Sequence, residues 1–215
     1  MIIDHIGLFF FPNLLILRMI GRVAFPLFAW LIANGSCHTR NIDLYLKRLF
    51  IFAVISQAPF YYANRLINPS FNTLNIFFTL FLGLLAIKLI KMSNSKLKWS
   101  LIIALSAFIG HIIKVDFGAI GVLSIIFFYI YFKDKKRLIL SQTAIYLIQP
   151  IYKLTESAAI NAGDILLYYI YYTPVILLTL VIILYYNNEE GRKMKYVFYL
   201  FYPLQFVIVY LLKSV

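Results

Sequence analysis

The sequence predicts an all-α protein, a polytopic bundle of about nine transmembrane helices, and three observations lead to this. Of the 215 residues, 63% are hydrophobic and only 13% are charged, with a mean hydropathy of +0.87, which lies outside the composition of soluble domains. The apolar runs are too long for core strands, and short polar clusters separate them in place of hairpin turns. That pattern is typical of membrane helices and not of a transmembrane barrel.

Nine candidate spans follow one another along the chain, each an apolar run bounded by polar residues. They cover residues 1–12, 14–35, 45–63, 73–91, 99–113, 119–132, 138–152, 165–186 and 196–212. Several are shorter than the ~20 residues that cross a bilayer upright. Either snorkelling lysines extend these spans, or residues 99–132 form a broken helix pair. No soluble stretch is left over, so we expect a single domain over residues 1–215.

Basic residues alternate between the two sides of these spans. Four polar turns hold 14 of the 20 Lys and Arg residues: Arg40, Lys47 and Arg48; Lys88, Lys91, Lys96 and Lys98; Lys133, Lys135, Lys136 and Arg137; Arg192, Lys193 and Lys195. The positive-inside rule makes these turns cytoplasmic, and the N-terminus is then cytoplasmic as well.

Charge and cysteine content exclude other classes of protein. A net charge of +12 would suggest nucleic acid as a partner of a soluble domain, but here the charges lie between apolar runs, so we expect the lipid bilayer and no nucleic acid. The single cysteine, Cys37, excludes an internal disulfide. It is spread with His5, His38 and His111 without metal-ligand spacing, so we expect no metal.

The first candidate site is the run from Met1 to Gly7, where Asp4 and His5 interrupt apolar residues. Ionisable groups inside a membrane segment are costly and indicate a functional site. Neighbouring residues on a helix point about 100° apart, so we expect Asp4 to pair with Arg18 or Arg22 rather than with His5. The alternative is that these groups only hold two helices together.

The second candidate site is the stretch 21–49, in which Arg40, Lys47 and Arg48 stand at the cytoplasmic opening of the third span. Arginine forks match phosphate oxygens, so this cluster suits a phosphorylated cytosolic ligand. The alternative is that membrane topology alone requires basic residues there.

Six blocks of the chain resemble the TraX family, membrane proteins named for N-terminal acetylation of conjugative pilin. The blocks are IIDHIGLFFFP, LRMIGRVAFPLFAWLIANG, HTRNIDLYLKRLFIFAVISQAPF, NIFFTLFLGLLAI, DFGAIGVL and KYVFYLFYPLQFVIVYLL. The family in turn resembles the acyltransferase-3 and heparan-glucosaminide acetyltransferase enzymes. That resemblance implies a bacterial inner-membrane acetyltransferase that takes its acetyl group from cytosolic acetyl-CoA.

The resemblance also implies roles for residues of this chain. His5 in IIDHIG would be the catalytic base, with Asp4 in the same block and Arg22 in GRVAFP as the buried basic partner. Arg40 in HTRN and Lys47 and Arg48 in LKRL would hold the CoA. Asp116 in DFGAIG matches the family but has no assigned role. Two features depart from it: members usually carry further helix before DHIG, and the last block often has His where this chain has Gln205.

The expected reaction is direct transfer of acetyl from acetyl-CoA to an amine or hydroxyl acceptor, such as a pilin N-terminus or an envelope glycan. His5 would take the acceptor proton, and Arg22 would orient Asp4 or stabilise the oxyanion. Two other classes stay open. Asp4, Arg22 and Asp116 would form the pathway of an ion-coupled transporter, and a non-enzymatic membrane assembly factor would need none of this chemistry.

Overall fold

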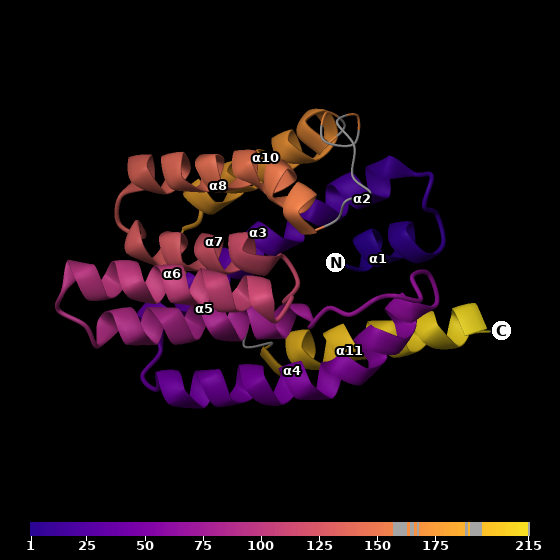
Figure 1. The fold of residues 1–215 in the computed structure, drawn as a ribbon, viewed down its shortest axis with the longest axis horizontal. Coiled ribbons are helices and arrows are strands. Elements are labelled where there is room, and N and C mark those ends of the chain that lie inside the picture. The colour runs from indigo at the N-terminus through magenta and orange to yellow at the C-terminus, as the bar shows by residue number, and fades with distance from the viewer. Residues whose placement is uncertain (157–162, 164–165, 167, 188, 190–194, 215) are drawn as a thin grey trace. The chain divides into compact units, whose positions relative to one another are not determined.

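A computed structural model describes residues 1–156, 163, 166, 168–187, 189 and 195–214 (Figure 1). Within these residues every regular element is a helix, and the isolated β-bridge between Leu74 and Val115 belongs to no strand. The all-α prediction is therefore confirmed. Arg192 and Lys193, two of the residues used to assign the cytoplasmic turns, and residue 165 at the start of the eighth predicted span lie outside the described residues.

Each predicted span contains helix. The elements are α1 (Ile2–Phe9), α2 (Leu15–Arg22), α3 (Ala24–His38), α4 (Ile42–Arg65), α5 (Ile76–Lys91), α6 (Lys96–Ile112), α7 (Gly118–Ile130), α8 (Lys135–Glu156), the π-helix η1 (Tyr168–Tyr172), α10 (Thr173–Leu184) and α11 (Lys195–Ser214). The predicted span 14–35 thus divides into α2 and α3, and the described part of 165–186 contains η1 and α10.

The number of spans is not confirmed. By length and hydropathy, two stretches of the described residues could cross a bilayer, Leu15–His38 and Tyr196–Ser214, while Gly118–Ile130 is apolar but shorter. The eight residues of α1 rise only about 12 Å, which is less than half of a ~30 Å hydrocarbon core. Proline at position 12 and the turn around it follow that helix, so the part of the first predicted span that the structure describes is too short to cross the core by itself.

Two asparagines start the helices that frame the second candidate site. The Asn41 side chain accepts a hydrogen bond from the Leu44 N–H at 2.9 Å and caps α4, and Asn75 accepts from the Phe77 N–H at 3.0 Å and caps α5. Both residues have extended backbone, as N-caps do.

The loop before α7 has an unusual backbone conformation. Lys114, Phe117 and Gly118 all have φ between 51° and 63°, a region that costs energy for residues other than glycine.

The described chain forms two compact units, each built from two stretches of sequence. The first unit comprises Met1–Cys37 and Leu123–Asn187, and the second comprises His38–Val122 and Asn188–Val215. Fully buried apolar side chains form the core of each: Ala29, Ile125, Ile126 and Phe128 in the first, and Leu49, Ala53, Leu84, Ile87 and Phe206 in the second. The single domain over 1–215 stays a prediction.

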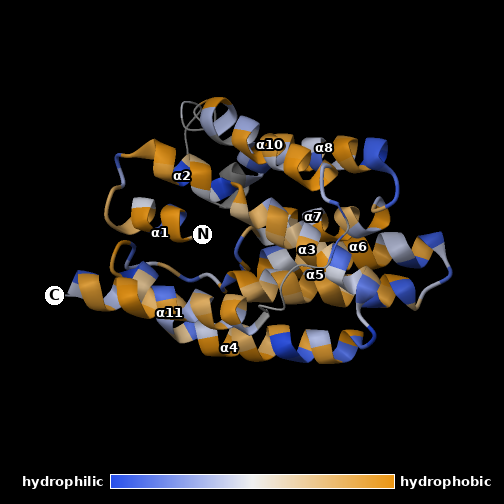
Figure 2. Cartoon of the chain, turned by 180° about the vertical axis from the view of Figure 1, so that it is seen from behind, coloured by the Kyte–Doolittle hydropathy of each residue, from blue (hydrophilic) through white to orange (hydrophobic). Residues whose placement is uncertain are grey.

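Hydrophobic residues dominate most of the helices (Figure 2), and many of their large apolar side chains are exposed. On α6 the exposed residues repeat every three or four positions, namely Leu97, Leu101, Leu105, Phe108 and Ile112. A continuous apolar face of this kind is unusual on a soluble monomer and marks contact with lipid or another apolar partner.

Candidate functional site in the first unit and basic cluster in the second

The first two helices pack backbone against backbone because glycine stands at each point of contact. A Cβ built on Gly21 of α2 would lie 2.1 Å from the Asp4 Cβ and 2.7 Å from the Asp4 Cα, and one built on Gly7 of α1 would lie 2.8 Å from the Leu17 Cβ. Any larger residue at these positions would push α1 and α2 apart. Gly21 is therefore a point of close helix contact.

This packing brings Asp4 against Arg18, one turn before Gly21 on α2. An Arg18 guanidinium nitrogen, Nη1, lies 2.9 Å from the Asp4 Oδ1, and each side chain is 17% exposed. The same nitrogen donates to the Asp4 backbone carbonyl at 3.2 Å. The sequence left Arg18 and Arg22 open as partners of Asp4, and the structure has the ion pair with Arg18.

His5 projects from the next position of α1. Its ring is half-buried, its Nδ1 is buried, and it meets the edge of Phe9 with 6.5 Å between ring centroids. An imidazole that is partly shielded from water can exchange a proton with a bound ligand. The position therefore suits a general base.

Arg22 ends α2, one turn after Arg18. Its side chain is half-buried and its Nε is buried. Residues four apart on a helix share a face, so Arg18 and Arg22 both lie on the side of α2 that carries the contact with α1. A guanidinium there adds positive charge close to the Asp4 region, where it could stabilise a developing oxyanion.

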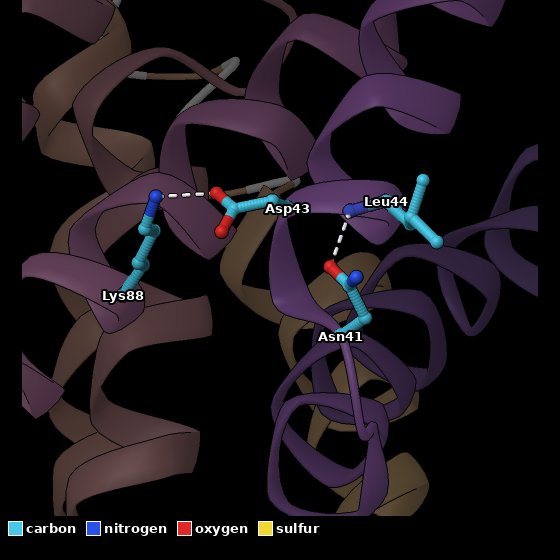
Figure 3. A network of polar contacts seen from close by, with 4 residues as sticks. All are labelled: Asn41, Asp43, Leu44 and Lys88. Atoms are coloured by element: carbon cyan, nitrogen blue, oxygen red, sulfur yellow. Dashed lines mark hydrogen bonds and ion pairs between the residues drawn. The ribbon is translucent and has the colours of Figure 1, made fainter.

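The second candidate cluster stands at the start of α4, in the second unit. Asp43 in the first turn of α4 forms an ion pair with Lys88 of α5, next to the Asn41 cap (Figure 3). The pair ties α4 to α5. It also offsets the charge of Lys88, one of the lysines in the turns predicted to be cytoplasmic, so Lys88 contributes less to binding an anion than its position suggests.

Arg48 is the member of the cluster that the structure holds in place. Its guanidinium lies 5.7 Å from the centre of the Tyr45 ring, and Tyr199 of α11 is close enough for a side-chain hydrogen bond to it. Its Nε is buried and has no hydrogen-bond partner among the described residues. Arg40 and Lys47 are exposed, so the structure does not fix them beside Arg48.

A satisfied polar network lies further along α4. Gln57 accepts from both the Asn75 backbone N–H and the Asn75 side chain at 2.9 Å, and it donates to the Thr73 carbonyl at 3.1 Å. Asn75 also donates to the Ala53 carbonyl at 2.7 Å. The Asp116 carboxylate accepts a hydrogen bond from the Phe117 N–H, and the Asp116 backbone carbonyl accepts one from the Thr79 hydroxyl. These contacts fix the loops at one end of the second unit.

The predicted residues thus divide between the units. Asp4, His5 and Arg22 belong to the first, and Arg40, Lys47 and Arg48 belong to the second. Sequence reasoning missed Tyr45 and Tyr199 as neighbours of Arg48. Tyr45 could have been found, because it stands three residues before Arg48 on one helix face, but nothing in the sequence links Tyr199 to it. Among the described residues, no group of three or more His, Cys, Asp or Glu side chains could hold a metal ion.

Comparison with known proteins gives two relatives. A protein of Dichelobacter nodosus described as "Probable fimbrial assembly protein FimC, serogroup H1" is 34% identical over 162 residues, which are 69% of this chain and 63% of that protein. An uncharacterized protein of Rickettsia prowazekii (strain Madrid E) is 36% identical over 86 residues, 39% of this chain and 30% of that protein. The chain therefore spans less than two thirds of either relative. No solved structure matches it significantly.

A family model described as "TraX protein" matches residues 1–213. The match includes both the α1–α2 contact and the basic start of α4, and it runs through α11. Because the model covers nearly the whole sequence, the chain belongs to the TraX family.

Proposed function

We propose that this chain is a membrane-embedded acetyltransferase. It moves an acetyl group from cytosolic acetyl-CoA to an amine or hydroxyl acceptor, such as a pilin N-terminus or an envelope glycan. The observation that carries the proposal is a half-buried imidazole, His5, on an apolar helix that glycine contacts fix against a helix bearing two arginines. The description of the Dichelobacter relative as a fimbrial assembly protein supports a pilus protein as acceptor.

In the proposed reaction His5 takes the proton from the neutral amine or the hydroxyl as it attacks the thioester carbonyl. A new C–N or C–O bond forms, the C–S bond breaks, and the CoA thiolate leaves with the proton that His5 returns. Arg22 stabilises the oxyanion that forms on the carbonyl oxygen. Asp4 keeps the arginine pair of α2 in register through its contact with Arg18. No acyl-enzyme is required.

The donor binds through the basic start of α4. Arg48 supplies a guanidinium that aromatic rings already orient, with an Nε that is free to donate, and such a group suits phosphate oxygens. Arg40 and Lys47 add exposed positive charge that attracts the donor from the cytosol.

The protein acts in the bacterial inner membrane, as a multi-pass protein with a cytoplasmic N-terminus. The two apolar stretches at Leu15–His38 and Tyr196–Ser214 and the exposed apolar face of α6 support this location. The positive-inside distribution supports the orientation.

The first prediction tests the base. The full chain, purified in detergent, is given acetyl-CoA labelled in the acetyl group and a peptide with a pilin-like N-terminus. His5→Ala should lower transfer at least about 100-fold, the usual effect of losing a general base, while its thermal stability stays close to that of the parent protein. His111→Ala, which removes an imidazole of the second unit, is the control and should keep activity. Parent-level turnover in His5→Ala would refute the assignment of the base.

A second candidate is a non-enzymatic assembly factor, which the description of the Dichelobacter relative favours. The two functions separate in a strain that lacks the gene and carries the His5→Ala chain. An assembly factor would restore pili fully, whereas the acetyltransferase would leave the masses of pilin and envelope glycans as in the deletion strain. The ion-coupled transporter stays an untested alternative.

A further inference from the structure

Two buried polar side chains of the second unit have no hydrogen-bond partner among the residues that the structure describes. The Gln205 residue on α11 is 7% exposed, and neither its Oε1 nor its Nε2 has a partner among the described residues; Ser56 on α4 is fully buried, and its Oγ has none either. A buried polar group without a partner destabilises a fold. A bound molecule that supplies hydrogen bonds to these groups would remove that cost.

The lack of bonds at Ser56 is unusual for a helical serine. The hydroxyls of Ser36 and Ser141 donate to the carbonyl three residues earlier in their helices, at 2.7 and 3.0 Å. Ser56 makes no such bond, so its hydroxyl is available for another acceptor or donor. Its neighbour Gln57 is different, because the Asn75 contacts already occupy that amide.

Both groups belong to the contact between α4 and α11, which lie side by side (Figure 1). Ser56 stands midway between Phe52 and Phe60 on α4. The Phe52 ring stacks on Tyr199 at 4.8 Å between centroids, and the Phe60 ring contacts Phe206, the residue after Gln205, at 5.1 Å. Ser56 and Gln205 therefore share the segment of the two helices that these ring pairs bound.

This segment lies a short distance from Arg48 along the same two helices. Ser56 is eight residues beyond Arg48 on α4, a rise of about 12 Å, and Gln205 is six residues beyond Tyr199 on α11, a rise of about 9 Å. The chain between the pyrophosphate of CoA and the second amide of its pantetheine arm has as many bonds as about three amino-acid residues, roughly 10 Å when extended. The spacing fits that arm.

We propose that Gln205 and Ser56 bind an amide of the pantetheine arm of the acyl donor, while Arg48 binds its phosphates. The Gln205 carboxamide accepts from the amide N–H and donates to its carbonyl, and Ser56 supplies a further hydroxyl bond. The surrounding aromatic rings cover the apolar parts of the arm. This inference rests on the proposed function, since it assumes CoA as the donor.

The test compares two ligands on the purified full chain in detergent. CoA carries both the phosphates and the arm, whereas adenosine 3′,5′-bisphosphate carries phosphates without the arm. Gln205→Leu should weaken CoA binding about tenfold, the effect of losing hydrogen bonds to the ligand, and should leave the bisphosphate affinity unchanged. Ser56→Ala should act in the same direction. Arg48→Gln should weaken both ligands.

Thermal stability without ligand gives a second readout. Because Gln205→Leu removes unpaired polar atoms from a buried site, the ligand-free variant should melt at the same or a higher temperature than the parent. The control is Gln149→Leu, at a buried glutamine of the first unit whose Oε1 also lacks a partner within the described chain. It should keep full CoA affinity, which shows that removing a buried amide does not by itself weaken binding.

Each other outcome overturns the inference. If the parent protein binds neither ligand, the donor assignment of the proposed function fails, and this inference fails with it. If the parent binds CoA and Gln205→Leu binds it equally well, only the inference fails. The same holds if Gln205→Leu weakens both ligands by one factor, or if it melts at a lower temperature, because its amide then serves the fold.

Discussion

Asp4 joins α1 to α2 in the first unit through both its side chain and its backbone. Arg18 approaches both its carboxylate and its backbone carbonyl, and Gly21 lets its backbone touch α2. The register that Gly21 sets places Arg18 in contact with the Asp4 carboxylate. Sequence alone could not choose between Arg18 and Arg22, because they are one turn apart on one helix face.

The ion pair gives a prediction about stability. Asp4→Leu or Arg18→Leu alone leaves a mostly buried charge without its partner and should cost roughly 3 to 5 kcal/mol of unfolding free energy, and the double substitution should recover much of that loss. The measurement is a double-mutant cycle of denaturation in detergent. Asp134 and Arg137, an exposed pair of the same unit at 3.3 Å, are the control and should couple by less than about 1 kcal/mol. Additive losses for Asp4 and Arg18 would disprove the pair.

Arg48 gives a prediction about donor binding. Arg48→Gln should raise the Michaelis constant for acetyl-CoA about 10- to 100-fold and change kcat little, because it removes a charged hydrogen bond to the phosphates and no group at the reacting carbonyl. Lys47→Gln, at an exposed neighbour, should raise it less than about fivefold. Equal effects of the two substitutions would mean that the cluster acts only through its net charge.

At the level of helices, hydrophobic patterning was sufficient to find where helices are but not how they cross a membrane. The runs 45–63 and 196–212 correspond closely to α4 and α11, since long apolar runs with polar ends leave few alternatives. The run 1–12 yields only the eight residues of α1. Apolar composition measures the preference of a run for lipid. The length of the helix also depends on the turn at Pro12, which apolar composition does not reveal.

The buried polar contacts were the least predictable features. Asn75 joins Gln57, 18 residues earlier in the chain, and Tyr199 meets Arg48 across about 150 residues of sequence. Such pairs depend on which helices pack together, and a single sequence without internal repeats gives no signal for that choice. Site residues on one helix, such as Asp4 with His5, could be found because an apolar run makes them stand out.

The contact between α1 and α2 gives a prediction about packing. Gly21→Ala should destabilise the protein by roughly 1 to 3 kcal/mol or more, because the new methyl group would meet the Asp4 backbone, which cannot turn aside. Gly7→Ala should destabilise the protein less than Gly21→Ala. Gly110→Ala should cost least, since its Cβ would meet a Val122 methyl at 3.0 Å. Thermal melting of the three variants measures the order. A Gly21→Ala protein as stable as the parent would contradict the close approach.

For the molecule as a whole, the distribution of basic residues is what predicts the membrane topology. Its net charge of +12 comes mainly from basic residues in the turns assigned to the cytoplasm, and those turns include the start of α4, where Arg48 would meet the donor. Under the proposed function, the same charges orient the protein in the membrane and attract an anionic ligand from the cytosol. An inverted topology would place Arg48 on the side that has no CoA, so the proposed donor site requires the predicted orientation.

The one cysteine of the chain allows this orientation to be measured directly. Cys37 is exposed at the end of α3, beside the turn assigned to the cytoplasm. A membrane-impermeant maleimide should therefore fail to label it in intact cells whose outer membrane has been made permeable, and should label it once the inner membrane is opened. The control is Ser70→Cys in a Cys37→Ser background, at an exposed position of the turn after α4, which lies on the opposite side if α4 crosses the membrane. That cysteine should react in intact cells. Labelling of Cys37 from outside would invert the topology and move the donor site away from the cytosol, whereas the expected pair of results would give α4 a complete crossing with Arg48 near its cytoplasmic end.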